Sequence, residues 1–130
     1  MPNLNLPKLI ICRFRYGTDP LRPTRKKLIK EEELARLVWQ NGHYVPDDVR
    51  LPLDKKRLGE AVAELEHSAL YTHLGKDEPD GSHSLYYLRV KPGDREYPKI
   101  FASALGRRLS YLSDKTHCII VNREERKSLL

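Results

Sequence analysis

The longest uninterrupted aliphatic runs in this chain are only four residues long, and they lie near its opposite ends, at residues 9–12 and 118–121. A helix that crosses a bilayer needs about 20 consecutive apolar residues, so neither run can span a membrane. Both runs are rich in isoleucine and bounded by polar or charged residues, which is typical of short strands. The sequence therefore predicts a strand over residues 9–16 and another over 117–122. If these two strands pair, the two cysteines of the chain belong to one sheet.

The first of these strands has two different faces. Over its second half, apolar or aromatic side chains at the even-numbered positions alternate with Arg13 and Arg15. Alternation of this kind is typical of a half-buried strand, with one face toward the core and the other toward solvent. Two prolines and a glycine within residues 17–24 then predict a loop.

Two helices are expected in the middle of the chain. Residues 30–41 carry leucines at helical spacing, three glutamates in the expected first turn and Asn-Gly at the end, which predicts a helix. A second helix is expected from Asp54, a suitable N-cap, to residue 73 or 74, because its apolar residues recur at intervals of three and four. Gly75 stands where a helix terminator is expected.

The remaining segments complete an α+β pattern. Polar turns are expected at 76–82 and 91–94, a strand over 84–90, and a third helix over 98–112 with Pro98 at its first position. The sequence predicts a small single domain, residues 1–130, with the order β-α-α-β-α-β. Its parts are a basic strand and loop (1–30), a core of helices and a hairpin (31–90) and a final helix and strand (91–130).

The middle of the chain resembles a winged helix-turn-helix domain over about residues 31–90. The segment 65–74, Leu-Glu-His-Ser-Ala-Leu-Tyr-Thr-His-Leu, leads through Asp80-Gly81 to Tyr86-Tyr87 in the way such domains pass from the recognition helix into the wing. The resemblance implies a recognition helix that begins near residue 54. Lys55, Lys56 and Arg57 in its first turn are then expected to contact phosphate.

Positive charge is concentrated at the two ends of the chain. The totals are 24 Lys+Arg against 18 Asp+Glu, a net charge of +6 and an isoelectric point near 9.4. Residues 1–30 carry +7 and residues 91–130 carry +4, whereas the middle is acidic. This balance favours a polyanionic partner, although a basic surface that only keeps the protein solvated is the alternative. The expected phosphate contacts are Arg13, Arg15, Arg22, Arg25, Lys26, Lys27, Lys30, Lys55, Lys56, Arg57, Lys99, Arg107 and Arg108.

No catalytic, metal or cofactor motif stands out. The five histidines are isolated in the sequence, and the His and Asp residues near the turn at 76–82 fit no zinc spacing. Cys12 and Cys118 each lie in an apolar run and are expected to be buried thiols, which suits a cytoplasmic or intracellular viral setting. We predict no catalytic residue, no metal and no cofactor.

The sequence leaves three functions open. The first is a non-enzymatic nucleic-acid-binding protein that contacts DNA or RNA phosphates through its basic ends. The second is a structural subunit of a larger ribonucleoprotein or of a phage or defence assembly, which adds a strand to a protein partner's sheet. The third is a small metal-independent ribonuclease that pairs His117 with Tyr87.

Overall fold

The structure is a computed structural model that describes residues 5–123. In chain order its elements are β1 (Leu9–Asp19), β2 (Arg22–Gln40), β3 (His43–Asp47), α1 (Lys55–His67), β4 (Leu70–Asp77), β5 (His83–Val90), α2 (Tyr97–Arg108), the 3-10 turn η1 (Ser110–Leu112) and β6 (His117–Arg123).

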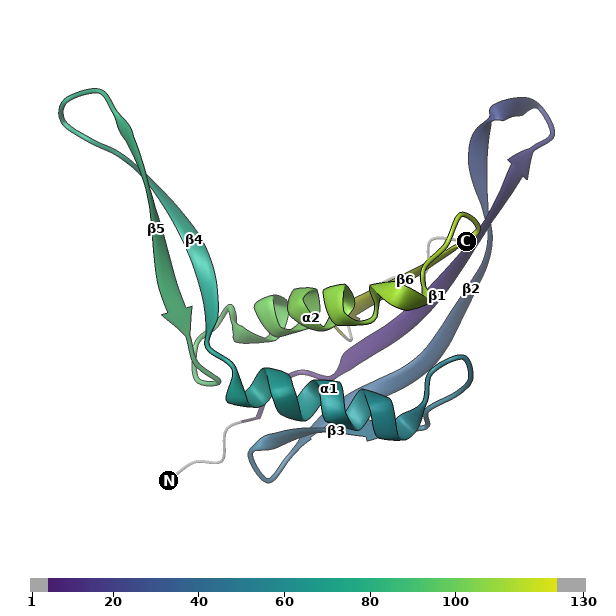
Figure 1. Cartoon of the computed structure of the whole chain (residues 1–130), viewed down its shortest axis with the longest axis horizontal. Coiled ribbons are helices and arrows are strands. Elements are labelled where there is room, and N and C mark those ends of the chain that lie inside the picture. Colours follow the sequence, from purple (N-terminus) through teal and green to yellow (C-terminus); the bar gives the residue numbers. More distant parts are fainter. Residues whose placement is uncertain (1–4, 124–130) are drawn as a thin grey trace.

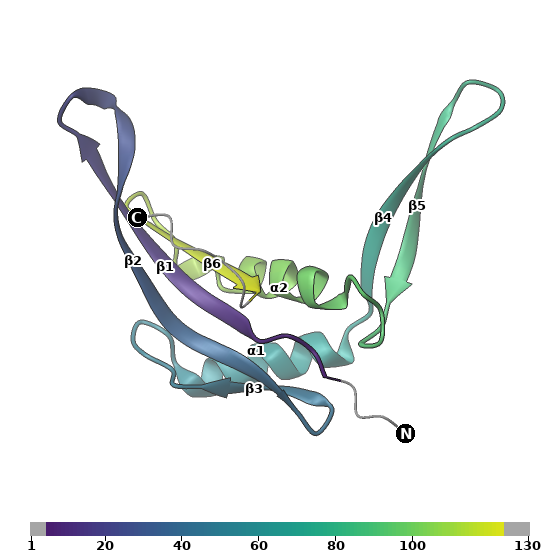
Figure 2. The same ribbon diagram turned by 180° about the vertical axis from the view of Figure 1, so that it is seen from behind.

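The elements form two layers and two projecting ribbons. Strands in the order β3-β2-β1-β6 make an antiparallel sheet, and α1 and α2 cover one of its faces (Figures 1 and 2). Strands β4 and β5 pair only with each other. The expected α+β single-domain fold is therefore confirmed, with more strand than the sequence indicated.

The core lies between the sheet and the two helices. From the sheet, Leu9 and Leu37 are fully buried, and from α2 so are Phe101 and Leu105. Helix α1 contributes a stripe at intervals of four and three, Leu58, Val62 and Leu65. Full burial of such a side chain stabilises the folded state by about 1.5–3 kcal/mol, so this core fixes the positions of both helices on the sheet.

Each of the two ribbons extends well beyond the core. The first, which we call the basic arm, is the end of the β1–β2 hairpin, residues 16–30, beyond the part of β1 that β6 covers. The second, the apolar arm, is the β4–β5 hairpin, residues 70–90. Figure 1 shows the two arms at opposite ends of the helical layer, both rising on the same side of it.

The two terminal strands, which the sequence predicts as strands, pair with each other. Cys12 lies opposite Ile120, and Phe14 lies opposite Cys118, so both cysteines belong to one sheet. The predicted strand at 84–90 is also confirmed as β5. Helix α2 with η1 covers nearly all of the predicted helix at 98–112.

The predicted helix over residues 30–41 is wrong, because these residues belong to β2. The cause is a β-bulge. Ile11 lies opposite Ala35 and Cys12 opposite Glu33, so Leu34 is an extra residue in β2. The bulge lets Leu34 and Leu37, three residues apart, enter the same core, and in the sequence this spacing imitates a helix.

The predicted loop over residues 17–24 is wrong as well. Strand β1 continues to Asp19 and β2 starts at Arg22, with the turn closed by Leu21 N–H donating to Asp19 Oδ1 at 2.9 Å. Pro23 is tolerated because the register passes from Thr18 opposite Lys26 to Asp19 opposite Arg22, which leaves residues 23–25 without a partner in β1 that would need the missing N–H. A second bulge lies at the root of the arm, where Arg15 faces Lys30 but Tyr16 faces Leu28.

Helix α1 is shorter than predicted, which corrects the element order. It ends at His67, where Ser68 Oγ donates to the carbonyl of Glu64 at 2.7 Å, and residues up to Asp77 form β4. Gly75 therefore lies inside a strand. Of the elements expected from the winged-helix pattern, the helix after Asp54 and the following hairpin are present, while residues 31–40 are strand.

Within residues 5–123, no helix has the length and apolar character required to cross a bilayer.

Candidate nucleic-acid interface

The basic arm presents cations to solvent on both of its faces. Its fifteen residues contain five basic side chains and one acid, Asp19. Lys26 and Lys27 are consecutive residues of β2, lying opposite Thr18 and Gly17, so their side chains leave opposite faces of the ribbon. Arg22 and Arg25 follow toward the tip, and both are exposed.

Four of the predicted phosphate contacts on or beside this arm have no ion-pair partner within residues 5–123. They are exposed in the structure, and their charge is available to a ligand. They are Arg15, Arg22, Arg25 and Lys27.

Arg13 and Lys30 differ from these four because they share a carboxylate. Arg13 Nη2 lies 2.8 Å from one oxygen of Glu32, and Lys30 Nζ lies 2.9 Å from the other. Hydrogen bonds from Lys30 and Arg13 hold the pKa of Glu32 below its usual range. The structure therefore gives both predicted contacts an internal partner at the root of the arm.

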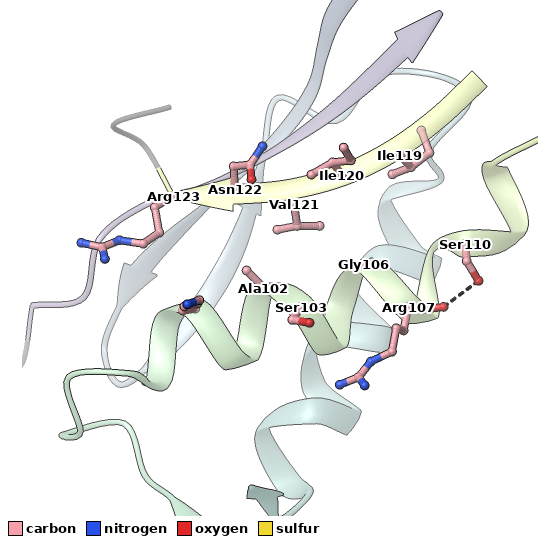
Figure 3. Close-up of a pocket in the computed structure, with 11 residues that line it drawn as sticks. Ala102, Ser103, Gly106, Arg107, Ser110, Ile119, Ile120, Val121, Asn122 and Arg123 are labelled. Atoms are coloured by element: carbon pink, nitrogen blue, oxygen red, sulfur yellow. Dashed lines mark hydrogen bonds between the residues drawn. The ribbon is translucent and has the colours of Figure 1, made fainter. Parts of the chain in front are cut away.

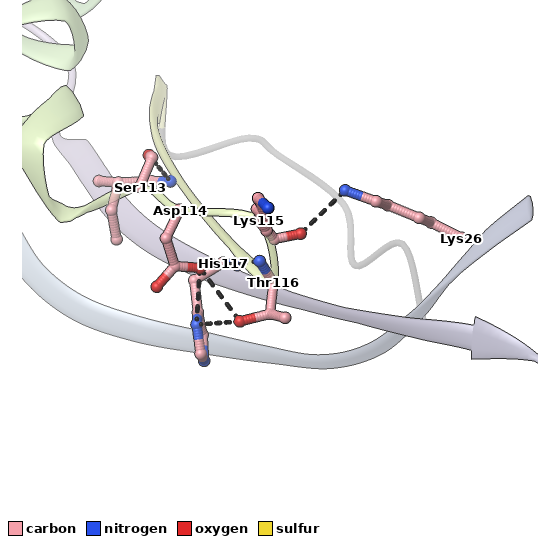
Figure 4. A network of polar contacts seen from close by, with 7 residues as sticks. Lys26, Ser113, Asp114, Lys115, Thr116 and His117 are labelled. Carbon is pink, nitrogen blue, oxygen red and sulfur yellow. Dashed lines mark hydrogen bonds and ion pairs between the residues drawn. The ribbon is translucent and has the colours of Figure 1, made fainter.

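Lys26 ties the arm to the turn before β6 (Figure 4). Its Nζ donates to the carbonyl of Lys115 at 2.8 Å, a neutral acceptor that leaves the lysine charge uncompensated. The turn is held by Asp114, whose Oδ1 accepts from the backbone N–H groups of Thr116 at 2.8 Å and His117 at 2.7 Å. These backbone hydrogen bonds lower the pKa of Asp114 to about 2. The arm is thus anchored to a rigid turn at its root.

The start of α1 brings further cations to the same end of the molecule as the basic arm (Figure 1). Asp54 caps the helix by accepting from Arg57 N–H at 3.1 Å, and Lys55 and Lys56 are exposed beside it. The Arg57 guanidinium lies 4.0 Å from the centre of the Tyr111 ring, so this side chain is already engaged in a cation–π contact.

The cations of α2 divide between two roles. Arg108 forms an ion pair with Glu64 of α1 and joins the two helices. Lys99 and Arg107 lie near opposite ends of α2, and both line a groove of about 1040 Å³ between this helix and β6 (Figure 3). Only Arg107 is at the end of α2 that adjoins the basic arm.

The structure does not bring the proposed ribonuclease pair together. His117 lies at the start of β6 and its Nδ1 contacts Thr116 Oγ1 at 2.9 Å. Tyr87 lies on the apolar arm, at the other end of the molecule, with its ring centre 4.6 Å from that of His73.

The His and Asp residues of the apolar arm make ordinary surface contacts. His83 Nδ1 lies 3.0 Å from Asp77 Oδ1, while Asp80 Oδ1 accepts from Ser82 N–H at 2.9 Å and closes the turn. In the part of the chain that the structure describes, no three His, Cys, Asp or Glu side chains are grouped so that they could hold a metal ion.

The sequence could not reveal the groove between α2 and β6. Its floor is formed by Ala102, Ile119 and Val121, residues whose apolar character predicts only a core position. The groove exists because β6 is the last strand of the sheet and α2 lies beside it. Neither fact can be read from local spacing.

Comparison of the chain with protein-family models, with curated proteins and with solved structures gives no significant match.

Proposed function

We propose that this chain is a non-enzymatic nucleic-acid-binding protein that contacts phosphates through its basic arm. The observation that carries the proposal is a projecting two-stranded ribbon with exposed cations that have no acidic partner within residues 5–123. They are Arg22, Arg25 and Lys27, with Arg15 at the root of the arm.

The chemistry of these side chains suits phosphate. Arginine offers a planar set of N–H donors that matches two phosphate oxygens, and lysine adds a compact charge. Binding releases the counterions condensed on the nucleic acid, which is the main source of affinity for a protein that does not read bases.

The shape of the arm also supports the proposal. The major groove of B-form DNA, about 12 Å wide, admits a two-stranded β-ribbon. A ribbon with Lys26 and Lys27 on opposite faces carries charge toward both walls of such a groove. Duplex DNA is therefore the ligand that the arm fits best, and the deep, narrow major groove of RNA fits it less well.

The test is the salt dependence of binding to a 20-base-pair DNA duplex, with an RNA duplex of the same sequence alongside. We expect the affinity for DNA to fall steeply as salt rises. In a variant with Arg22, Arg25 and Lys27 replaced by Ala, the slope of log affinity against log salt is expected to decrease by about 2 to 3, because each lost phosphate contact removes about 0.9.

A matched control removes three cations from the opposite end of the molecule. Lys76, Lys91 and Arg95 are exposed, and their side chains make no ion pair within residues 5–123. Replacing all three with Ala changes the net charge equally and is expected to leave most of the slope intact. If the slope decreased equally in both triple variants, binding would depend on net charge and not on the basic arm. Absence of binding at low salt would refute the proposal.

An interaction subunit is the second candidate function, and the apolar arm favours it. This ribbon exposes large apolar side chains on both faces, which is unusual for a surface that stays in water.

A further inference from the structure

The apolar arm exposes large apolar side chains that no other part of the described chain covers. Six large side chains on it are 43% to 61% exposed: Tyr71, Leu74, Leu85, Tyr86, Tyr87 and Leu88. Directly opposite residues share a face, so Leu74 and Tyr86 lie on one face and Tyr87 on the other. Only Val90, at the root, is fully buried. A two-stranded ribbon of this kind is marginally stable by itself in water, and a partner that covers it would stabilise it.

The tip of the apolar arm is acidic. Asp77, Glu78 and Asp80 lie within four positions of one another at the turn, with Lys76 as the adjacent cation. Hydrogen bonds from Tyr86 and Ser84 lower the pKa of Glu78. The arm is thus an apolar ribbon that ends in negative charge.

The groove between α2 and β6 has an apolar floor, as the arm has apolar faces, but it is lined by cations, whereas the tip of the arm is acidic (Figure 3). Ala102 and Val121 face each other across it. Lys99 and Arg107 also line it, and because both are exposed they form part of its rim. None of the described residues that line the groove is acidic.

The groove also exposes the backbone of an edge strand. At the start of β6, two backbone N–H groups that point away from β1 already have side-chain acceptors. His117 N–H donates to Asp114 Oδ1, and Ile119 N–H donates to Ser113 Oγ at 2.9 Å. By the alternation of an antiparallel ladder, Val121 turns its backbone groups outward too, and no strand of the described chain pairs with that side. Such an edge can accept one more strand.

We propose that the apolar arm of one copy of this chain docks in the α2–β6 groove of a second copy and pairs β5 with the outer edge of β6. The apolar side chains of the arm cover the floor formed by Ala102, Ile119 and Val121. The acidic tip lies at one end of the groove, against the nearer of the two cations Lys99 and Arg107. The arm cannot fill the groove of its own chain, since it projects away from the helical layer beyond the start of α2 (Figure 1).

The lengths are compatible. Residues 119–123 of β6 span about 17 Å, within the roughly 26 Å of an eight-residue strand. The six half-exposed side chains of the arm are divided equally between its two faces, so three of them enter the groove. The contact joins different surfaces on the two copies, so it propagates head to tail into rings or filaments.

The test is sedimentation velocity of the nuclease-treated full chain over a concentration series, with charge reversal at each side of the contact. One variant carries Asp77→Lys and Glu78→Lys, and Asp80 is kept because it closes the turn. The other carries Lys99→Glu and Arg107→Glu. We expect the wild-type chain to associate, and each variant alone to associate at least about tenfold more weakly, because like charges then meet at the contact.

Combining the changes gives the decisive result. An equimolar mixture of the two variants, and a single chain carrying all four substitutions, are both expected to recover association because tip and rim are again opposite in charge. The control is Leu51→Ser, which removes an exposed apolar side chain that belongs neither to the apolar arm nor to the lining of the groove and is expected to leave association unchanged.

Three results would overturn the inference. They are a wild-type chain that stays monomeric at several hundred micromolar, association that both variants retain, or association that nuclease treatment abolishes. The last would show that nucleic acid bridges the copies. None of these results bears on the salt slopes measured for the basic arm, so the two proposals fail separately.

Discussion

The two arms have the same backbone architecture but different side chains. Each is an antiparallel two-stranded ribbon that projects from the same side of the helical layer. The basic arm has five cations and one acid, whereas the apolar arm exposes six large apolar side chains and an acidic tip. The comparison shows that the two arms have the same ribbon backbone, and that they differ in the side chains that their faces expose, cations on one and apolar groups on the other.

The arms also differ in how they join the body. The basic arm continues β1 and β2, so its direction is set by the main sheet and by the contact between Lys26 and Lys115. The apolar arm is joined to the helices by short segments at Ser68 and at residues 91–96. We therefore expect the first arm to be held more firmly than the second.

The largest expected effect that tests this difference is at Phe14. This ring is 1% exposed and lies in β1 just before the basic arm begins. Phe14→Ala is expected to lower the free energy of unfolding by about 3–5 kcal/mol, the usual loss for a buried phenyl ring. Urea unfolding followed by circular dichroism measures it. Leu21→Ala, at the exposed tip of the same arm, is the control and is expected to change stability by less than about 0.5 kcal/mol.

A smaller loss is expected at the root of the apolar arm. Val90 is the buried end of β5, and Val90→Ala removes less volume from the core than Phe14→Ala does. We expect a decrease of about 2 kcal/mol in the same urea experiment. Leu85→Ala in the same strand is half-exposed and serves as the control. If Val90→Ala lowered the free energy of unfolding as much as Phe14→Ala does, the apolar arm would be held as firmly as the basic arm, contrary to our expectation.

The smallest effect concerns the turn that holds the basic arm. The pKa of Asp114 is lowered to about 2, so the folded state binds this proton less readily than the unfolded state does. Its stabilising contribution is therefore complete above about pH 4 and is lost as the pH falls toward 2. Asp114→Asn is expected to be less stable than the wild type at pH 7.

The measurement for Asp114 is thermal unfolding at several pH values between 2 and 7. The difference in Tm between the wild type and the Asn variant is expected to shrink as the pH falls through this range. A difference that is the same at every pH would show that the charge of Asp114 does not stabilise the turn.

The sequence was informative where local pattern and tertiary environment agree. The β-branched segments at the two ends became paired strands, and the apolar-striped segments that follow Asp54 and begin near Pro98 became α1 and α2. It misled where a bulge changed the period, as at Leu34, because an extra residue gives a strand the apolar spacing of a helix.

The candidate sites divide in the same way. Charge clusters are visible in a sequence, so Arg22, Arg25 and Lys27 can be identified without knowledge of their exposure. The pairing of Arg13 and Lys30 with Glu32 was not visible, since it depends on which residues meet across two strands. The α2–β6 groove was missed for a related reason, because an edge is a property of the whole sheet.

The bulge at the root of the basic arm sets the direction of the arm, not the faces of its cations. Ile29 is the extra residue there, and its side chain lies over Gly17, which has no side chain to obstruct it. Deleting Ile29 would close the bulge and leave Tyr16, Gly17 and Thr18 opposite Leu28, Lys27 and Lys26 as before. Each lysine would keep its face, but the ribbon would lose the local bend and the additional twist that a bulge introduces. A single deletion would therefore re-aim the charges of this arm without changing their number or their order.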